Sequence, residues 1–398
     1  MQNDHLVFLG AKRTPFGANG GSLKDVNPTV LGVSAGKAAL AEAGLRPDQI
    51  QHVIIGNVIQ SASDSIYTPR HIGLKLGIPI SVPALGINRL CGSGFQVIVD
   101  AYHHLLAGDV EFALVGGVEN MSMTPYVLRG ARWGYRLGNG TAEDMMTTAL
   151  TDSYTGDPMA ITAENLGAKY NVTRQDADDF SLRSQELTKQ AIADGGFKDE
   201  IAPFEMQDRK GEMFRLERDE HPRPETTKES LGKLKSIFKK DGLVTAGSAS
   251  GIVDGAACLV VGSAKAAEKL KLRPLARMVS YGVSGCDPAL MGIGPAPSTR
   301  QALERAGMTL DKMDLIEVNE AFAAQAIAVE RELKIPREKL NLEGGAIAIG
   351  HPLAASGSRI IAHLIHQLRK KKKRYGLGTA CIGGGQGIAV IIENLEKT

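Results

Sequence analysis

The chain has few cysteines, few aromatic residues and little net charge, and each shortage argues against a class of protein. Only four cysteines occur among 398 residues, and they are far apart, with no Cys-x-x-Cys pair. A disulfide framework or a zinc site is therefore not expected, and we predict no bound metal and a reducing compartment. A net charge of +2 gives no support for a nucleic-acid or membrane-surface partner.

Long apolar runs and leader signals are also missing. No uninterrupted apolar stretch is long enough to span a bilayer. The first residues, Met1–His5, contain neither a basic segment nor the apolar core of a signal peptide. We therefore expect a cytoplasmic protein, or a protein of the mitochondrial matrix if the source is eukaryotic.

Glycine is abundant, with 46 residues, whereas aromatic residues make up only 5%. This balance favours an α/β protein with tight turns over a β-sandwich. The segment Ala39–Leu45 matches Ala302–Met308, which lies 263 positions later, and the same offset carries Ser93-Gly94 onto Ser356-Gly357. Each Ser-Gly pair opens an amphipathic helical pattern that a strand-like stretch and a glycine cluster follow. The unchanged offset predicts two copies of one α/β unit.

A region of different composition lies between the two copies, at roughly residues 119–251. It is rich in charge and carries helical patterns over 162–169 and 174–193, the second preceded by Thr173 as its N-cap. We interpret it as an insertion that folds over a layered α/β core. The expected organisation is an N-terminal half over 1–118, an inserted loop domain over 119–251, and a last part over 252–398. That last part holds the remainder of the N-terminal half, to about residue 271, and then the C-terminal half.

Cys91 stands in the most informative short segment, Gly86–Gln96. An apolar stretch ends, the cysteine follows, and two glycines around a serine precede a helical pattern over Phe95–Leu106. A thiol at a helix N-terminus lies near unsatisfied N–H groups and the positive end of the helix dipole, which stabilise a thiolate. A free cysteine is otherwise usually a small buried core residue. This segment alone leaves the nucleophile and the core thiol equally open.

The repeat adds a possible partner for Cys91. Alignment of the copies places Asn88 opposite His351 and Cys91 opposite Ala354. Two such halves tend to pack about a pseudo-twofold axis, so we predict that the His351 turn faces the Cys91 turn and supplies a base. Two more polar loops of the second half follow strand patterns, where reactive groups of α/β sheets collect.

These loops carry a resemblance to a known family. Four segments resemble the four signature loops of the thiolases: Asn88–Gly94, Asn319–Phe322, Gly350–Gly357 and Cys381–Gly387. Further matches, in the same order over nearly the whole chain, are Lys12–Gly17, Met159–Asn165 and Ala246–Gly255. The resemblance implies a thiolase-like duplicated α/β core in five layers, α-β-α-β-α, with an inserted loop domain.

The resemblance also implies a reaction and the residues that perform it. Cys91 would be the nucleophile that forms an acyl-enzyme, His351 its base, and Cys381 the second acid and base. Asn319 would hold a water that completes one oxyanion hole with His351, and the backbone N–H groups of Cys91 and Gly383 would form the other. The reaction would be the reversible cleavage of 3-ketoacyl-CoA by CoA, in fatty-acid β-oxidation.

Coenzyme A (CoA) would be a substrate and not a permanently bound cofactor. The resemblance implies that Ser250 contacts its pantetheine arm, that Arg223 meets its nucleotide phosphates, and that the thioester tunnel is lined by Met159, Met291 and Phe322. Arg223 is equally well explained as a solvated surface cation, and the methionines as core filling. The family further implies a homodimer or a homotetramer, with Met121–Gly140 as the tetramer loop.

Two departures from the family pattern bear on the substrate range. Ala354 stands where a glycine usually follows the Pro-Leu pair, so its methyl group could crowd the acyl-enzyme, and a positive φ there would shift the backbone. Pro158 stands where thiolases specific for acetoacetyl-CoA commonly have a histidine. We therefore expect a broader 3-ketoacyl-CoA thiolase. An acetoacetyl-CoA thiolase is the first alternative, and a catalytically silent acyl-CoA- or lipid-binding relative is more remote. Cys381 speaks against a decarboxylating ketosynthase, which typically has a histidine there.

Overall fold

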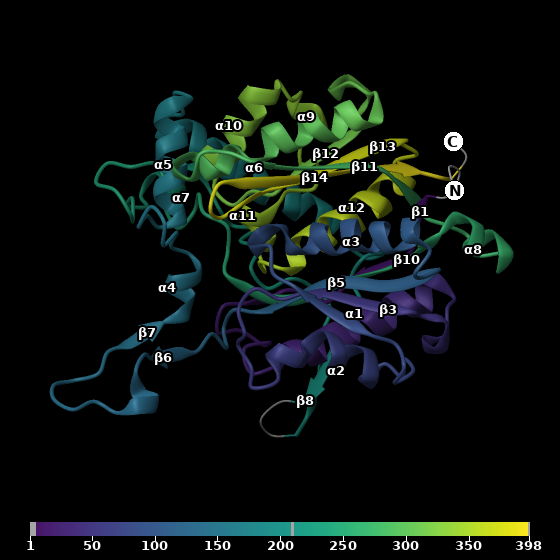
Figure 1. Ribbon diagram of the computed structural model, residues 1–398. Coiled ribbons are helices and arrows are strands. Elements are labelled where there is room, and N and C mark those ends of the chain that lie inside the picture. Colours follow the sequence, from purple (N-terminus) through teal and green to yellow (C-terminus); the bar gives the residue numbers. More distant parts are fainter. Residues whose placement is uncertain (1–4, 208–210, 397–398) are drawn as a thin grey trace.

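The computed structural model of the protein describes residues 5–207 and 211–396 and has five layers (Figure 1). Helices cover each outer face, two sheets lie inside them, and α3 (Ser93–Ala107) and α12 (Ala355–Lys370) fill the space between the sheets. The expected α-β-α-β-α core is confirmed. Within the described residues no helix is both long and apolar enough to cross a membrane. Residues 1–4, which carry most of the expectation about a leader, lie outside the described part.

The first half of the chain builds one sheet. Its strands lie in the order β4 (Ala84–Ile87), β3 (His52–Gly56), β5 (Phe112–Asn120), β10 (Val253–Ser263) and β1 (Leu6–Arg13), with the short β2 (Gly17–Ala18) paired to β10. β3 is parallel to both of its neighbours, and β10 is antiparallel to both of its own. The helices of this half outside the central layer are α1 (Pro28–Ala43), α2 (Thr68–Lys75) and α8 (Ala264–Lys269).

The second half repeats this pattern. Its strands lie in the order β12 (Leu315–Val318), β13 (Tyr375–Ile382), β14 (Gln386–Asn394) and β11 (Ala276–Gly285), and its helices besides α12 are α9 (Pro295–Ala306), α10 (Ala323–Leu333) and α11 (Ala346–Ile349). A parallel pair is followed by two antiparallel pairs, as in β3-β5-β10-β1. The two sheets join through two residue pairs between β1 and β11. The duplication inferred from the sequence is therefore present in the strand order.

The matched sequence segments fold alike in the two halves. Gly44 ends α1 and Gly307 ends α9, both in the left-handed region, with φ of 65° and 61°. Glycine adopts this conformation without the strain of a side chain, and its N–H then satisfies carbonyl groups of the last helical turn. Pro28 and Pro295 open the same two helices, where the missing N–H of proline costs nothing.

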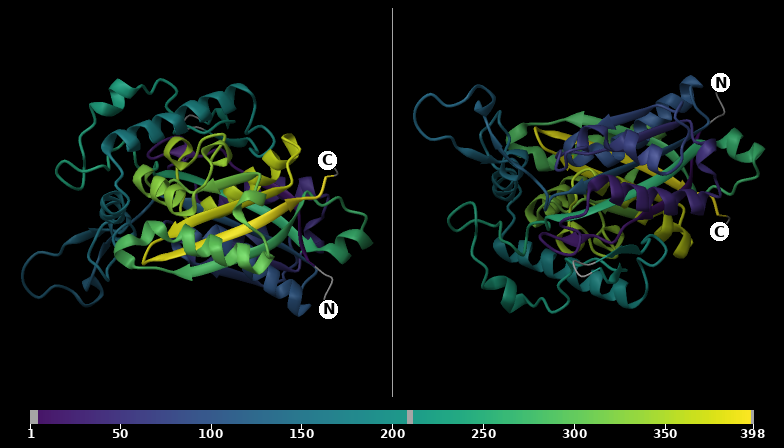
Figure 2. Two further views of the ribbon diagram at one scale, coloured as in Figure 1. Left: turned by 90° about the horizontal axis from the view of Figure 1, so that it is seen from above. Right: turned by 90° about the horizontal axis from the view of Figure 1, so that it is seen from below.

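The region between β5 and β10 wraps one flank of the layers and projects a hairpin from one end (Figures 1 and 2). Its elements are β6 (Tyr126–Leu128), β7 (Ala142–Asp144), α4 (Met145–Ala149), α5 (Met159–Lys169), α6 (Arg174–Ala193), β8 (Phe204–Gln207), β9 (Met213–Leu216) and α7 (Lys228–Gly232). Thr173 caps α6, because its Oγ accepts the N–H of Asp176 at 3.0 Å. The division of the chain at residues 118 and 251 remains our proposal.

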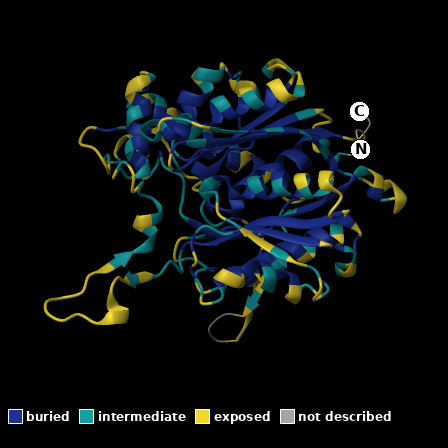
Figure 3. Cartoon of the chain, in the orientation of Figure 1, coloured by how far each residue is buried: buried dark blue, intermediate teal, exposed yellow. Residues whose placement is uncertain are grey.

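α12 lies at the centre of the molecule and is buried from Ala355 to Leu368 (Figure 3). It nevertheless carries His363, and buried polar groups need partners. His363 Nδ1 lies 2.6 Å from Glu200 Oε2, and the other carboxylate oxygen accepts a hydrogen bond from Arg13 Nε of β1 at 2.7 Å. Glu200 belongs to the inserted region, so buried charges tie that region to the duplicated core.

Candidate active site

Cys91 lies where β4 passes into α3. Leu90–Gly92 form a 3₁₀ turn, and α3 begins at Ser93. Ser93 Oγ closes this turn, because it donates to the carbonyl oxygen of Leu90 at 2.7 Å and accepts the N–H of Arg89 at 2.9 Å. The strand, tight turn and helix indicated by the sequence are therefore all present.

The Cys91 thiol is partly buried and holds its proton at rest. Burial raises its pKa to about 11 and the nearby charge of Glu119 adds to this, although the backbone N–H of Gly383 reaches the thiol and acts in the opposite direction. A thiol is a much weaker nucleophile than a thiolate. Cys91 therefore needs a base in order to react.

His351 is held in the protonation state that a base requires. Its Nδ1 lies 2.5 Å from Ser356 Oγ, which itself donates to the carbonyl oxygen of Pro352 at 3.0 Å. The imidazole Nδ1 is therefore the donor, and Nε2 presents its lone pair to Asn319 Nδ2 at 3.3 Å. Burial, helped by the positive charge of Arg359, lowers the pKa of His351 to about 3. The ring is neutral and its Nε2 can accept a proton.

Cys381 is a second thiol beside the first. It stands at the end of β13 and is fully buried, in an apolar cluster with Met291, Ala321, Met159 and Phe322. Burial raises its pKa well above the ordinary value, and the neighbouring Cys91 and Cys286 raise it further. Cys91 thus lies beside Gly383 and Cys381, and His351 lies beside Asn319. Leu353, two residues after His351, belongs to the apolar cluster against which Cys91 packs.

A cavity of about 340 Å³ opens at His351. Its remaining lining is largely apolar and comes from the inserted region and the loops of the second half: Met121, Met146, Thr147, Leu150, Thr151, Pro158, Met159, Ala160, Phe238, Ala249, Ser250, Gly251, Ile252, Phe322 and Leu353. Cys91, Met146 and Leu150 pack against one apolar cluster, which contains Leu353, whereas Met159 and Phe322 pack against the cluster that contains Cys381. The two thiols therefore lie behind different parts of the cavity wall.

The structure places the five predicted substrate-binding residues in three ways. Ser250, Met159 and Phe322 line the cavity, and Ser250 N donates to the carbonyl oxygen of Ala321 at 3.0 Å. Met291 is buried beside Cys381 and does not reach the lining. Arg223 is exposed and stands outside the lining, held by its backbone N–H on Gln185 Oε1 at 2.9 Å.

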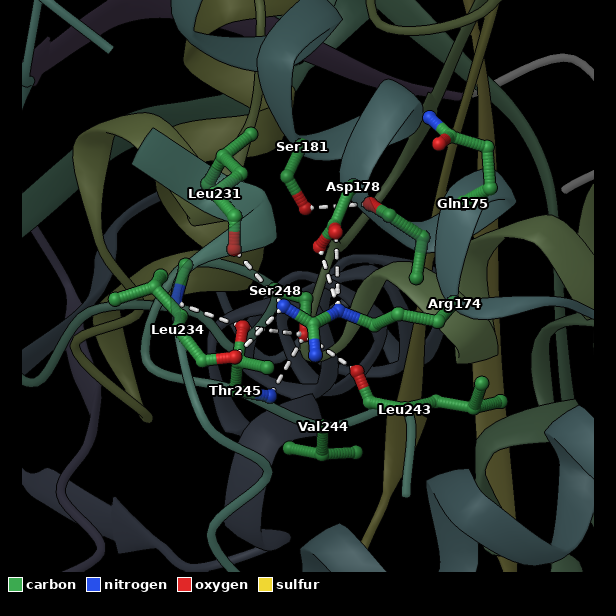
Figure 4. Close-up of polar contacts among 12 residues, drawn as sticks. Arg174, Gln175, Asp178, Ser181, Leu231, Leu234, Leu243, Val244, Thr245 and Ser248 are labelled. Carbon is green, nitrogen blue, oxygen red and sulfur yellow. Dashed lines mark hydrogen bonds and ion pairs between the residues drawn. The ribbon is translucent and has the colours of Figure 1, made fainter. Parts of the chain in front are cut away.

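Arg174 of α6 holds the segment that leads to Ser250 (Figure 4). Its Nε lies 3.0 Å from both carboxylate oxygens of Asp178, and its Nη2 donates to the carbonyl oxygens of Leu231 and Leu234 at 2.8 and 2.9 Å. In the same group Ser248 Oγ accepts the N–H of Thr245 and donates to the carbonyl oxygen of Leu243. Arg174 therefore fixes the segment after α7, and the hydrogen bonds of Ser248 close the turn that leads to Ser250.

Ala354 does not behave as the sequence predicts. Its φ is −71°, so the backbone needs no left-handed conformation there. A methyl group added to Gly56 would lie 3.5 Å from Ala354 Cβ, and Ala354 is not part of the cavity lining. The Ala354 side chain therefore lies against Gly56, and the expected crowding of the acyl-enzyme is wrong.

Sequence patterns missed several residues of the site. Met121, Met146, Leu150 and Phe238 line the cavity and come from segments without a recognisable motif, whereas Leu353 lies in the Gly350–Gly357 loop but was not predicted to line it. Their apolar character is the only available signal, and core residues share it. No group of three or more histidine, cysteine or acidic side chains in the described parts of the chain is arranged to hold a metal ion.

Comparisons with known proteins agree with this arrangement. The family model "Thiolase, N-terminal domain" matches residues 6–265, and "Thiolase, C-terminal domain" matches residues 272–394. The chain is 53% identical to a mitochondrial 3-ketoacyl-CoA thiolase of Bos taurus, over 98% of both chains. It is 46% identical to an acetyl-CoA acetyltransferase of Syntrophomonas wolfei, over 98% of this chain and 99% of that one.

Solved structures give the same result. The crystal structure of human mitochondrial 3-ketoacyl-CoA thiolase in complex with CoA superposes with a TM-score of 0.95, at 51% identity, covering 98% of each chain. The likeness thus extends over both halves and the insertion, at identities far above those at which only a fold is shared. The chain belongs to the thiolase family.

Proposed function

We propose that the chain cleaves 3-ketoacyl-CoA thioesters with CoA, giving acetyl-CoA and a shortened acyl-CoA. One observation carries the proposal: a neutral base, His351, opens onto a cavity whose walls pack against two separate thiols, Cys91 and Cys381. Cleaving a carbon–carbon bond beside a ketone requires a nucleophile for the acyl group and an acid for the departing enolate. The two thiols fit these two roles.

In the first half-reaction, Cys91 Sγ attacks the keto carbon and its proton passes to His351 Nε2. The bond between the keto carbon and the α-carbon then breaks, which leaves the acyl group as a thioester on Cys91 and releases the enolate of acetyl-CoA. The Cys381 thiol protonates that enolate at its α-carbon. Its raised pKa suits a group that must hold its proton until the carbanion forms.

In the second half-reaction, the thiol of a new CoA gives its proton to the Cys381 thiolate and its sulfur attacks the acyl-enzyme. Cys91 Sγ leaves and recovers the proton held by His351. Both thiols and His351 regain their starting protonation states, so the enzyme is ready for another turnover. The sequence of steps is ping-pong, with the acyl-Cys91 enzyme as the intermediate.

Two oxyanions form along this path, and two sets of donors are in place for them. The N–H groups of Cys91 and Gly383 serve the oxygen of the acyl group, since the Gly383 N–H already reaches the Cys91 thiol. Asn319 and His351 serve the thioester oxygen of the departing acetyl-CoA. Among the described residues no donor reaches Asn319 Oδ1, which leaves that oxygen able to accept from a water molecule held beside the substrate.

The cavity provides a place where CoA would bind as a substrate. Ser250 and the aromatic ring of Phe238 stand at the part of the wall that the inserted region supplies, where the pantetheine arm would pass. The human relative of known structure is a complex with CoA, which supports CoA as the ligand. We keep Arg223 as a contact for the nucleotide phosphates, because it is exposed and therefore accessible to an anion.

We further propose that the protein is a homodimer or a homotetramer. The edge strand β4 carries no partner on its outer side in the described sheet, and exposed edges of this kind are prone to pair with another chain. Trp133 and Leu137 on the projecting hairpin are 87% and 98% exposed, an unusual position for large apolar side chains. Light scattering of the parent and of a Trp133→Ser, Leu137→Ser variant tests the role of the hairpin, with a loss of the tetramer as the expected result.

For the location we retain the cytoplasm, with the mitochondrial matrix as the alternative. The relative from Bos taurus is a mitochondrial thiolase, which supports the alternative for a eukaryotic source. Fractionation of the native host, followed by detection of the protein, distinguishes the two.

The decisive experiment is a CoA-dependent cleavage assay over a series of 3-ketoacyl-CoA chain lengths. We expect turnover with acetoacetyl-CoA and with longer substrates, and a covalent acyl adduct on Cys91 by intact-protein mass when CoA is omitted. Cleavage confined to acetoacetyl-CoA would favour the acetyl-CoA acetyltransferase alternative, and binding without turnover would favour a silent acyl-CoA-binding protein. A Cys91→Ala variant that still cleaved at the parent rate would overturn the proposal.

A further inference from the structure

We propose that Glu119 is a positioning residue for this reaction, whose single buried carboxylate holds the Cys91 turn and the His351 turn in fixed relation. The inference rests on the proposed function for the roles of Cys91 and His351. Glu119 stands near the end of β5 and is fully buried. It belongs neither to the Cys91 turn nor to the His351 turn, and it forms hydrogen bonds with residues that support both turns.

On the His351 side, Glu119 Oε2 accepts the N–H of Ala354 at 3.1 Å. Ala354 belongs to the turn that starts at His351 and opens α12. The carbonyl oxygen of Pro352 in the same turn accepts the N–H and the Oγ–H of Ser356, whose Oγ is the partner of His351 Nδ1. Glu119 therefore anchors the turn that sets the orientation of the base.

On the Cys91 side, the Glu119 carboxylate accepts hydrogen bonds from the loop that follows β3. Its Oε1 accepts the N–H of Ile59 at 2.9 Å and Nδ2 of Asn57 at 3.1 Å, and its Oε2 also accepts the N–H of Val58 at 3.1 Å. The carbonyl oxygen of Val58 in turn accepts Nδ2 of Asn88 at 3.1 Å.

The hydrogen bonds of that loop lead on to the turn that carries Cys91. Asn88 Oδ1 accepts the N–H of Leu90 at 3.0 Å, which is the residue directly before Cys91. Val58 also packs in the apolar cluster that contains Cys91 and Leu353. A continuous set of hydrogen bonds therefore leads from the Glu119 carboxylate to the nucleophile turn of one half and to the base turn of the other.

The geometry demands a carboxylate at this point. Four N–H donors converge on two oxygens, and a carboxylate has acceptor sites for all of them and no hydrogen of its own. A glutamine would turn an N–H₂ group towards two of the donors. No lysine or arginine within residues 5–207 and 211–396 forms an ion pair with Glu119, so backbone and amide donors alone hold the group.

The carboxylate also acts on Cys91 through its charge. Burial raises the pKa of Glu119 to about 7, against the hydrogen bonds from Ile59, Ala354 and Val58, and the nearby Asp254 raises it further. Burial is the main cause of the raised pKa of the Cys91 thiol, and the ionised Glu119 adds a smaller contribution in the same direction. Removal of the Glu119 charge should therefore lower the pKa of the Cys91 thiol, which loss of a purely structural contact would not do.

Two variants distinguish the effect of the length of the Glu119 side chain from the effect of its charge. Glu119→Gln keeps the length of the side chain and removes the charge, whereas Glu119→Asp keeps the charge and shortens the reach. We expect both to slow acyl-enzyme formation at saturating 3-ketoacyl-CoA, on the order of 10²-fold, because a displacement of reacting groups by about 1 Å has that effect. Only Glu119→Gln should shift the pH dependence of Cys91 alkylation by iodoacetamide, and the shift should be towards lower pH.

Glu164→Gln is the matched control. Glu164 of α5 is also buried and accepts the backbone N–H groups of Leu243 and Val244, but it contacts neither catalytic turn. We expect this variant to lose stability while it forms the acyl-enzyme at close to the parent rate. Thermal unfolding of all variants shows whether a slow reaction reflects a damaged fold.

The outcomes separate the inference from the proposed function. A parent protein that forms no acyl-enzyme counts against the function, whereas an active parent with fully active Glu119 variants counts against Glu119. An unchanged alkylation profile in a folded Glu119→Gln protein, or rates in Glu119→Asp equal to the parent, would overturn the positioning role. If neither variant folds, the carboxylate is needed for the fold itself and the inference fails.

Discussion

Gly94 and Gly357 occupy equivalent positions in the two halves of the chain and lie against each other where α3 packs on α12. A methyl group added to Gly94 would come within 2.9 Å of Gly357 N, and a methyl group added to Gly357 would come within 2.6 Å of the carbonyl carbon of Gly94. Ser358 Oγ donates to the carbonyl oxygen of Gly94 at 2.8 Å across the same contact. The two helices that carry the turns of Cys91 and His351 therefore meet at their first residues, backbone to backbone.

Replacement of Gly94 by alanine should destabilise the protein, because the new methyl group would meet the carbonyl oxygen of Ala354 at 2.5 Å and the backbone cannot yield as a flexible side chain would. Overpacking of this kind costs about 1–3 kcal/mol. Urea unfolding of Gly94→Ala against the parent measures the loss. Gly232→Ala is the control, since no atom lies within 4 Å of the position of its new methyl group. Equal stability of the two variants would contradict the close contact.

This contact explains why so much of the site could be predicted from the sequence. Gly94 and Gly357 are separated by the 263-residue offset that also relates Gly44 to Gly307. Glycine stands at the first pair where a methyl group would meet backbone atoms, and at the second pair where φ is positive. A duplicated chain records its symmetry in such local matches, so the opposition of the Cys91 and His351 turns follows from the repeat.

The support of the site could not be predicted in the same way. Glu119 meets Ala354 and Glu200 meets Arg13 across long stretches of sequence, and a pairing of that kind leaves no periodic pattern. The place of the Ala354 side chain against Gly56 was also not predicted. A motif gives the usual residue at a position, but the direction of the Cβ depends on where the neighbouring strand lies, and here that neighbour is Gly56.

Ser356→Ala should reduce activity through the tautomer of His351. Ser356 Oγ accepts the Nδ1 proton and so leaves Nε2 as the base, and without this partner the ring can adopt the other tautomer. We expect the rate of acyl-enzyme formation to fall by roughly 10- to 100-fold, less than the ~10²–10⁴-fold that general-base help supplies, because part of the population keeps the productive tautomer. The fall should appear in kcat more than in the KM for CoA, because Ser356 does not line the cavity.

Ser358→Ala provides the comparison for this prediction. Ser358 is equally buried on the same helix, but its Oγ donates to Gly94 and does not meet His351. Single-turnover acylation of both variants at saturating substrate separates the two effects. If both serine variants slowed acylation equally, the loss would reflect packing of α12 and not the tautomer.

Acid should weaken the attachment of the inserted region through Glu200. Burial alone raises the pKa of Glu200, but the charges and hydrogen bonds of His363 and Arg13 outweigh it and lower the pKa to about 2. A depressed pKa means that the stabilisation is complete above the unfolded value of 4.5 and is lost as the pH falls towards 2. The shift corresponds to about 3 kcal/mol of folding free energy.

Urea unfolding of the parent and of Glu200→Gln between pH 7 and 3 tests this. At neutral pH the variant should be less stable by about 3–5 kcal/mol, because it leaves Arg13 and His363 without their carboxylate. The difference should shrink as the pH falls below about 4.5, since the unfolded parent then takes up a proton at Glu200 while the folded protein keeps the carboxylate until about pH 2. Glu205→Gln, at an exposed ion pair with Arg215, should show no such convergence. A difference independent of pH would contradict the assignment of the shifted pKa to Glu200.

Leu150 should control which acyl chains the enzyme accepts. It lines the cavity with Met146 and packs in the cluster around Cys91, so an acyl group on Cys91 would extend along its side chain. Each buried methylene contributes about 0.8 kcal/mol, or roughly fourfold in kcat/KM. Leu150→Phe should therefore depress kcat/KM for long 3-ketoacyl-CoA substrates and spare acetoacetyl-CoA, whereas Leu150→Ala should shift the preference towards longer or branched chains.

The same residue links specificity to the hairpin. Leu150 follows α4 directly, and α4 continues from β7, with Asp144 Oδ1 capping it on the N–H of Met146 at 2.9 Å. Leu137→Ala at the exposed tip is the control, because it changes the hairpin without touching the cavity. If Leu150 acts through the acyl group, only its variants change the chain-length profile. If both variants change it in the same way, the hairpin acts on the cavity through α4, and the acyl preference depends on what the hairpin contacts.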